Sequence, residues 1–249
     1  MQRKVSAFLA LSGAEQSRGT GGLPCVWLGY RVENGRLVRR GLPPRARGGL
    51  LGITAAGDGG DPERIAREIG AECRYRAMGG VFWDLPEGSG TAPVRQVGSR
   101  LARRGLRQLV PLHLAEVLPE ARVLIPGAVT GGSYQELLEV SAARFGPGRC
   151  WLEPVRLACD FCMPARDADG VRLEPADLAA LLAQNGGESW FCPTLCTRYF
   201  TYTAGEDSHF VLFDDPAAAG ERLRRAAKAG FSGFLIRRRD WPEQLPPLP

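Results

Sequence analysis

The chain of 249 residues is 44% hydrophobic and 24% charged, an ordinary globular balance that excludes disorder, collagen-like repeats and coiled coils. No run approaches the roughly 18 uninterrupted apolar residues of a membrane-spanning helix, so we expect no membrane span. The net charge of +5 is compatible with an anionic partner without identifying one. Basic residues are not interleaved with aromatic residues in the way that nucleic-acid binding requires, so we expect no nucleic-acid partner.

The first predicted element is a strand over Val5–Leu11. Arg3 and Lys4 before it give the segment some likeness to a short signal peptide, but small polar residues dilute its apolar core and no cleavage site follows. Seven cysteines are an odd number in a chain long enough for a full core, which argues against a disulfide framework. We therefore expect a cytoplasmic protein, with secretion as the alternative.

The next strand is expected over Cys25–Val32. Asn34 and Gly35 follow it and are a strong signal for a hairpin, with Arg36–Arg39 as the returning strand. Gly49–Thr54 is an apolar run that begins at a glycine pair, which is typical of a strand buried in a parallel sheet. The sequence thus predicts a hairpin near the start of a largely parallel sheet.

Helices and strands then alternate to the end of the chain. The first helix is expected to begin at Asp61, with Pro62 in its first turn and Glu63 near the positive end of the helix dipole. The other predicted strands are Val81–Leu85, Leu109–Leu114, Val123–Val129, one within Trp151–Phe161, one within Trp190–Thr201, and Phe234–Ile236. The other predicted helices are Ala92–Arg104, a short link near Ala115–Leu118, Tyr134–Phe145, Glu174–Gln184 and Ala217–Ala229.

About eight strands separated by helices fit either a closed barrel or an open doubly wound sheet. No glycine-rich dinucleotide fingerprint or phosphate-binding loop follows any strand, so we expect no cofactor. The length fits one barrel, and no linker-like segment divides the chain. We therefore predict an α/β fold, a (β/α)8 TIM barrel forming a single domain over residues 1–249, with an N-terminal β-hairpin as an elaboration.

The active site of such a barrel lies at the C-terminal ends of its strands, where Asp84 and Glu87 are the most suggestive pair. Phe82 and Trp83 precede them, and an apolar wall of this kind can raise the pKa of an acid. Pro86 is expected to end the strand, which allows Glu87 to turn back over the barrel mouth. The pattern predicts an acid/base pair with Trp83 in a sugar-binding surface. The alternative is that Glu87 belongs to a solvated loop.

Several other polar and aromatic residues are expected near the ligand. They are Asp160, Arg198, Tyr199, Tyr202 and Arg237. The two tyrosines lie in an unusually aromatic stretch, CTRYFTY, and either stack on sugars or pack a long loop. Arg237 begins a run of three arginines at the end of the last strand, which either meets an anionic ligand or forms a surface charge run.

The stretch HFVLFDDPAAAGERLRRAAKAGFSGFLI, from His209 to Ile236, resembles the closing segment of the chitinase-like glycoside hydrolases of family 18. Those proteins typically end with a short strand, an Asp-Pro-capped helix, the pattern A-x-x-x-G-x-x-G and the eighth barrel strand, and Ala226–Gly233 is similar to that pattern. GLLGIT and GGVFWDLPE resemble the third and fourth strands of the family. The resemblance implies a TIM barrel that binds or hydrolyses an amino-sugar polymer of the peptidoglycan or chitin type.

The family signature on the fourth strand is Asp-Gly-x-Asp-x-Asp-x-Glu. Its Glu protonates the leaving oxygen, and the neighbouring Asp orients the acetamido group that acts as nucleophile. With Asp84 on the last Asp, Pro86 stands at the Glu; with Glu87 on the Glu, Leu85 stands at that Asp. The tryptophan that usually ends the eighth strand falls at Arg237.

The resemblance therefore implies a degenerate catalytic motif, with Glu87 as the acid and Asp84 as the orienting group if the chain is catalytic. Two alternatives remain open. One is an inactive barrel that serves as a binding or assembly protein, and the other is an unrelated barrel enzyme that acts on an anionic substrate through its arginines.

Four cysteines form a further constellation: Cys159, Cys162, Cys192 and Cys196. Four thiolates at these spacings can bind zinc tetrahedrally. The first pair, however, is expected within a strand and its exit, not in a zinc knuckle, and unpaired cysteine is a common core residue. We therefore expect no metal, with structural zinc as the alternative.

Overall fold

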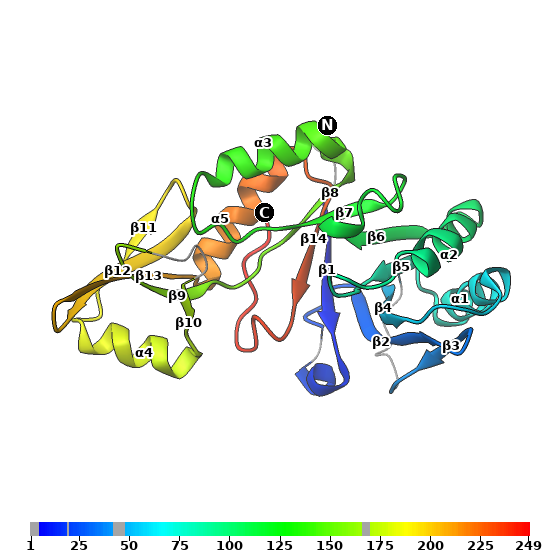
Figure 1. The fold of residues 1–249 in the computed structure, drawn as a ribbon, viewed down its shortest axis with the longest axis horizontal. Coiled ribbons are helices and arrows are strands. Elements are labelled where there is room, and N and C mark those ends of the chain that lie inside the picture. The colour runs from blue at the N-terminus through cyan, green and yellow to red at the C-terminus, as the bar shows by residue number, and fades with distance from the viewer. Residues whose placement is uncertain (1–4, 19, 42–47, 166–169) are drawn as a thin grey trace.

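The computed structural model describes residues 5–18, 20–41, 48–165 and 170–249 (Figure 1). Parallel strands from both ends of the chain meet and close a barrel. In spatial order they are β1 (Ser6–Leu11), β2 (Cys25–Glu33), β4 (Leu50–Ala56), β5 (Gly80–Trp83), β6 (Arg107–Pro111), β7 (Arg122–Pro126), β8 (Cys150–Glu153) and β14 (Gly233–Arg237). The last strand pairs with the first. The predicted TIM-barrel-like α/β fold is confirmed.

The predicted hairpin follows the second barrel strand. β3 (Arg36–Arg39) pairs antiparallel with β2. Asn34 and Gly35 have φ values of 50° and 69°, which are the left-handed values that a two-residue hairpin turn requires. The dipeptide therefore forms the turn that its conformational preferences predict.

Helices cover the outside of the barrel, and the first of them begins at the predicted cap, Asp61. They are α1 (Pro62–Arg76), α2 (Ala92–Arg103), α3 (Tyr134–Phe145) and α5 (Pro216–Lys228). Asp61 accepts a hydrogen bond from the N–H of Glu63 at 2.9 Å, and Asp215 accepts one from the N–H of Ala218 at 2.7 Å. Short 3-10 turns make other connections: η1 (Gly13–Arg18), η2 (Leu112–Leu114, beside the predicted link) and η3 (Pro147–Arg149).

Strand residues fill two apolar layers because side chains alternate across a strand. One cluster draws a buried residue from every barrel strand and fills the interior: Phe8, Ala10, Val26, Leu50, Phe82, Leu109, Leu124, Trp151 and Leu235. The other layer lies between the barrel and its helices and includes Trp83. Phe82 and Trp83 therefore lie in different layers although they are neighbours in the chain.

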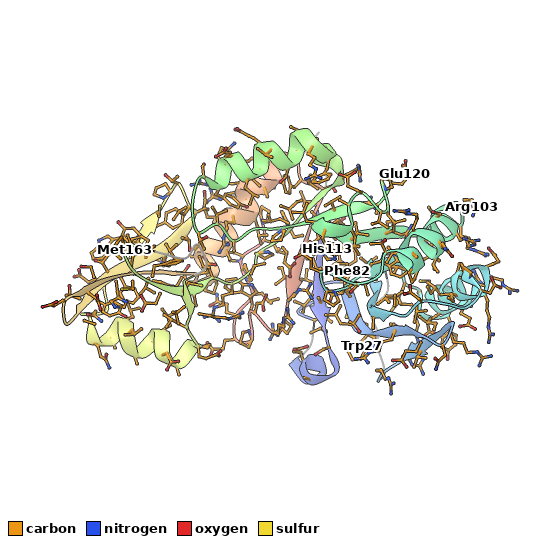
Figure 2. The ribbon with its side chains drawn as sticks, in the orientation of Figure 1. Trp27, Phe82, Arg103, His113, Glu120 and Met163 are labelled. Carbon is orange, nitrogen blue, oxygen red and sulfur yellow. The ribbon has the colours of Figure 1, made fainter. Side chains whose placement is uncertain are left out.

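A second, antiparallel sheet is inserted between β8 and α5. Its order is β10 (Val171–Arg172), β9 (Ala158–Met163), β13 (Asp207–Phe213), β12 (Thr197–Ala204) and β11 (Trp190–Cys192). Helix α4 (Pro175–Gln184) packs on one face of it through Leu178. Figure 1 shows this inserted sheet beside the barrel, and Figure 2 marks Phe82 in the barrel and Met163 far from it in the inserted sheet.

The inserted sheet corrects two strand predictions. The segment Trp151–Phe161 holds two strands instead of one, because the barrel strand β8 ends before Pro154 and β9 belongs to the other sheet. Trp190–Thr201 holds β11 and most of β12, and neither is a barrel strand.

Asp214 joins the two ends of the insertion to the barrel. Its buried carboxylate accepts hydrogen bonds from the N–H of Leu157 and the hydroxyl of Thr197, both at 2.7 Å, and forms an ion pair with the buried Arg222 of α5. Arg222 also donates to the carbonyl of Gly127 at 2.8 Å. One carboxylate thus connects the entry and the exit of the insertion with an outer helix of the barrel.

Two further expectations concern the signal-like segment at the N-terminus and the absence of a membrane-spanning helix. The predicted first strand forms β1, whereas Arg3 and Lys4 of the signal-like segment lie outside the described residues. Within the described ranges, no helix has both the length and the apolar character that crossing a bilayer requires.

Candidate functional site

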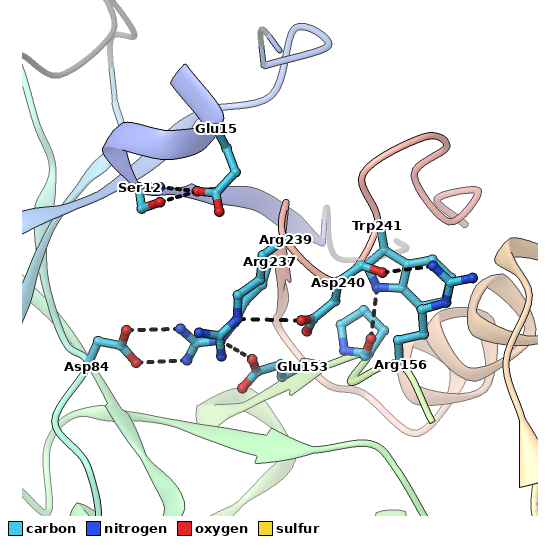
Figure 3. A network of polar contacts seen from close by, with 10 residues as sticks. Ser12, Glu15, Asp84, Glu153, Arg156, Arg237, Arg239, Asp240 and Trp241 are labelled. Carbon is cyan, nitrogen blue, oxygen red and sulfur yellow. Dashed lines mark hydrogen bonds and ion pairs between the residues drawn. The ribbon is translucent and has the colours of Figure 1, made fainter. Parts of the chain in front are cut away.

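Three charged side chains from the ends of three barrel strands meet at the barrel mouth (Figure 3). Asp84 follows β5, Glu153 ends β8 and Arg237 ends β14. Nη1 and Nη2 of Arg237 donate to the two carboxylate oxygens of Asp84 at 2.9 and 2.7 Å, and its Nε donates to Glu153. We call Asp84, Glu153 and Arg237 the mouth triad.

The strand period places these groups over the barrel interior. Phe82 points inward from β5, so Asp84, two residues later, continues the same face. The guanidinium carbon of Arg237 lies 5.7 Å from the centre of the Phe82 ring. The inner apolar layer therefore ends in Phe82, and the mouth triad lies above it.

The electrostatics of the mouth triad follow from its partial burial. The side chains of Arg237 and Glu153 are each 11% exposed, and that of Asp84 is 21% exposed. Burial raises the pKa of the Glu153 carboxyl, and the charge of Arg237 opposes this only in part. Burial alone lowers the pKa of Arg237, but the bonds and charges of Asp84 and Glu153 outweigh it and raise that pKa above its usual value. Arg237 is therefore a fixed cation, whereas Glu153 is held closer to protonation than a solvated glutamate.

A pocket of about 470 Å³ adjoins the mouth triad. It is lined by Glu153, Val155, Arg156, Arg172, Arg239 and Asp240, and we call it the arginine pocket. Trp241 packs beside this pocket. It is fully buried, and its Nε1 donates a hydrogen bond to the carbonyl of Pro154 at 3.0 Å. The guanidinium of Arg156 covers that indole at 5.5 Å.

Another mouth loop is held by a local contact. Glu15 of η1 accepts a hydrogen bond from the backbone N–H of Ser12 at 2.6 Å and a second from the Ser12 hydroxyl. These contacts close the turn directly after β1 (Figure 3).

The structure brings together two of the residues predicted for the site and separates others. Asp84 and Arg237 are two of the three members of the mouth triad. Glu87 is exposed in a turn after Pro86, which is the solvated-loop alternative. Trp83 does not face a ligand: it is fully buried under the outer helices, where its Nε1 donates to Gln108 at 3.0 Å. The correction follows from strand alternation, since Phe82 and Asp84 take the inward positions.

Asp160 and Tyr202 lie in the inserted sheet instead of at a barrel strand end. The Tyr202 hydroxyl donates to Asp160 at 2.6 Å, and Nδ1 of His209 lies 3.0 Å from the same carboxylate. The Tyr202 ring stacks on His209 with centroids 4.5 Å apart. Burial, and next the bond to Asp160, raise the pKa of Tyr202 to about 12. These two predicted residues are thus part of a hydrogen-bonded cluster on the face of the sheet that carries α4.

Arg198 and Tyr199 also have partners within the chain. Arg198 forms an ion pair with Asp215, the N-cap of α5. The Tyr199 ring stacks on Phe210 with centroids 5.2 Å apart and lies 6.0 Å from Trp190. These contacts favour the packing interpretation of the aromatic stretch.

Glu153 is a site residue that was not predicted from the sequence, although the sequence carries a signal for it. Glu153 closes the apolar run CWLE directly before Pro154, much as Asp84 closes GVFW shortly before Pro86. The prediction places one strand within Trp151–Phe161, and the candidate acid for this part of the chain is therefore Asp160 instead of Glu153.

Four of the seven cysteines are buried: Cys25, Cys73, Cys150 and Cys196. Cys162 is exposed and Cys196 is buried. Throughout the part of the chain that the structure describes, no three histidine, cysteine or acidic side chains are grouped so that they could hold a metal ion.

No family model matches the sequence, and no curated protein matches it. Solved structures do match the fold. The spore cortex-lytic enzyme SleL of Bacillus megaterium QM B1551 has a TM-score of 0.63 at 12% identity, over 95% of this chain and 71% of that chain. A variant of the GH18 chitinase of Cycas revoluta, in complex with (GlcNAc)4, has a TM-score of 0.59 at 13% identity, over 93% and 94%.

The putative sporulation-specific glycosylase YdhD of Bacillus subtilis has a TM-score of 0.57 at 12% identity, over 83% of this chain and 89% of that chain. Identities this low show a shared fold. The barrel that the C-terminal resemblance implied is confirmed, and its structural neighbours are family 18 chitinases and spore glycosylases.

Proposed function

We propose that this chain is a glycan-binding barrel that takes an amino-sugar polymer of the peptidoglycan or chitin type at its mouth. The shared fold supports this, because the Cycas revoluta neighbour was solved with a GlcNAc oligomer. The charged groups at the mouth also support it, because buried polar groups at strand ends are the usual means by which a barrel orients a polar ligand.

The ion pair between Asp84 and Arg237 is the observation that favours binding over hydrolysis. A glycosidase acid must hold a proton and direct a free oxygen at the glycosidic bond. Both oxygens of Asp84 accept hydrogen bonds from Arg237, and Glu153 is bound to the same guanidinium. Glu87, the other acid near this strand end, is exposed to solvent. The arrangement suits the recognition of hydroxyl and amide groups better than proton transfer.

Hydrolysis is the second candidate, and the burial of Glu153 favours it. That burial raises the pKa of Glu153, as a general acid requires. In this candidate a bound ligand draws Arg237 away and leaves Glu153 as the acid, or Glu87 acts as the acid with Asp84 as the orienting group.

Titration with (GlcNAc)4, followed by backbone amide shifts in NMR, tests the proposal. We expect shifts at the ends of β5, β8 and β14 and none along α1. A fluorogenic GlcNAc oligomer is assayed in parallel and should not be turned over. Turnover that disappears in Glu153→Gln or in Glu87→Gln would replace binding by hydrolysis and identify the acid. The absence of both shifts and turnover with chitin-type and peptidoglycan-type oligomers would refute the proposal.

A further inference from the structure

We propose that the arginine pocket binds a carboxylate carried by the polymer, so that the chain selects an acidic amino-sugar polymer over a neutral one. This inference rests on the proposed function, because it assigns a substituent of the same ligand to a second place beside the mouth triad. Nothing in the pairing of Asp84 with Arg237 requires an acidic ligand, so the inference depends on the arginine pocket alone.

Positive charge exceeds negative charge in the arginine pocket. Three segments supply one guanidinium each: Arg156 in the β8–β9 connection, Arg172 on β10 and Arg239 after β14. Of the two acids in the lining, Glu153 is already bound to Arg237, whereas Asp240 lies 3.5 Å from Arg239. Among the described lining residues there are therefore three guanidinium groups, and Asp240 is the one carboxylate that does not belong to the mouth triad.

The arginines keep donors available for a ligand. Arg156 is positioned by the Trp241 indole and by a 3.4 Å bond from Nη1 to the carbonyl of Asp240. A guanidinium has five N–H donors, so most of its donors remain after this bond. The side chain of Arg239 is 66% exposed. A planar guanidinium matches a carboxylate in a bidentate fashion, which makes a carboxylate a well-suited occupant.

The arginine pocket lies directly beside the mouth triad, where the polymer is proposed to bind. Glu153 belongs both to the pocket lining and to the mouth triad. A sugar bound over the triad therefore presents its neighbouring substituents to the pocket. A volume of about 470 Å³ is within the usual size range of small-molecule sites, so a carboxylate-bearing sugar unit fits. The carboxylate can come from a lactyl ether, as in muramic acid, or from a uronic acid.

Matched oligosaccharides that differ only in charge provide the test. A GlcNAc–MurNAc tetrasaccharide with free carboxyl groups is compared, by calorimetry, with its carboxamide and with (GlcNAc)4. We expect the wild-type protein to bind the free acid roughly tenfold more tightly than the amide, since a charge-assisted hydrogen bond contributes about that factor. Added salt should reduce the preference. A hyaluronan tetrasaccharide shows whether a uronic acid is preferred over a lactyl group.

Two pocket variants and one control make the result specific to the pocket. Arg172→Gln and Arg239→Gln should lose most of the preference for the acid and keep the wild-type affinity for (GlcNAc)4. Arg95→Gln, an exposed arginine of α2, should keep both. Equal binding of acid and amide by the wild type would overturn this inference and leave the proposed function standing. Failure to bind any of the oligomers would refute the proposed function itself.

Discussion

Arg237 determines the electrostatic character of the barrel mouth. The family 18 resemblance places a tryptophan at the end of the eighth strand, where this chain has Arg237. The exchange replaces an apolar surface by a fixed cation, and Asp84 and Glu153 are its counter-charges. A buried ion pair of this kind adds little net stability by itself, but the loss of one member leaves an uncompensated charge.

Arg237→Gln should therefore destabilise the fold, by about 3–5 kcal/mol. It leaves Glu153 buried and without its cation. The pKa of Glu153 is already raised by burial in the native protein, and without Arg237 it should rise further. A carboxyl whose pKa is higher in the folded than in the unfolded state binds its proton more tightly when folded, so stability falls as pH rises. The free energy of unfolding, measured in urea, should therefore fall less relative to the wild type at pH 5 than at pH 7.5.

The double variant Arg237→Gln with Glu153→Gln is the control for that prediction. It removes the buried charge together with its partner, so it should recover much of the lost stability and show no difference in deficit between the two pH values. An equal deficit of the single variant at both pH values would show that Glu153 is not the uncompensated group.

At the scale of elements, the sequence predicted what local chemistry determines. Helix α1 begins at the predicted Asp61 because a capping carboxylate followed by proline favours that start in any tertiary setting, and Asp215 with Pro216 begins α5 in the same way. The sheet to which a strand belongs is a non-local property, and the aromatic, β-branched run around Tyr199 is as suitable for an antiparallel sheet as for a barrel. The end of β8 at Glu153 depends on the same non-local property: Pro154 follows it in the sequence, but the assignment of β9 to the other sheet shows that the barrel strand stops there.

The hairpin turn between β2 and β3 depends on Gly35. Gly35 has a φ of 69°, and a Cβ built on it would lie 2.7 Å from the Cα of Gly60 in the loop before α1. Gly35→Ala should destabilise the protein by at least about 1 kcal/mol, since an L residue with a side chain is strained at this φ and would also push the loop away. Gly13→Ala, where the new Cβ meets nothing within 4 Å, is the matched control in urea unfolding. Equal stability of the two variants would show that the hairpin is not fixed against that loop.

The barrel and the insertion can unfold together as one domain or separately as two. The sequence predicts a single domain because no linker divides the chain. The inserted sheet has its own apolar clusters around Phe200 and Leu212, which would allow separate unfolding. Against this, the ion pair of Asp214 and Arg222 joins the insertion to α5 with both side chains at most 1% exposed. We expect the ion pair and its hydrogen bonds to couple the two parts.

Buried cysteine thiols can report this coupling, since the barrel and the insertion each contain at least one. Burial raises the pKa values of Cys25 and Cys73 to about 12 and that of Cys150 to about 11, so these thiols should resist a thiolate-specific reagent until they are exposed.

In pulsed alkylation at increasing urea, read by mass spectrometry, exposed Cys162 should react first. Cys196 of the insertion should then react at the same urea concentration as Cys25, because unfolding either part breaks the bonds of Asp214. Asp214→Asn should separate the two transitions. Labelling of Cys196 well before Cys25 in the wild type would instead show that the insertion is a separate domain, and the single-domain prediction would be wrong.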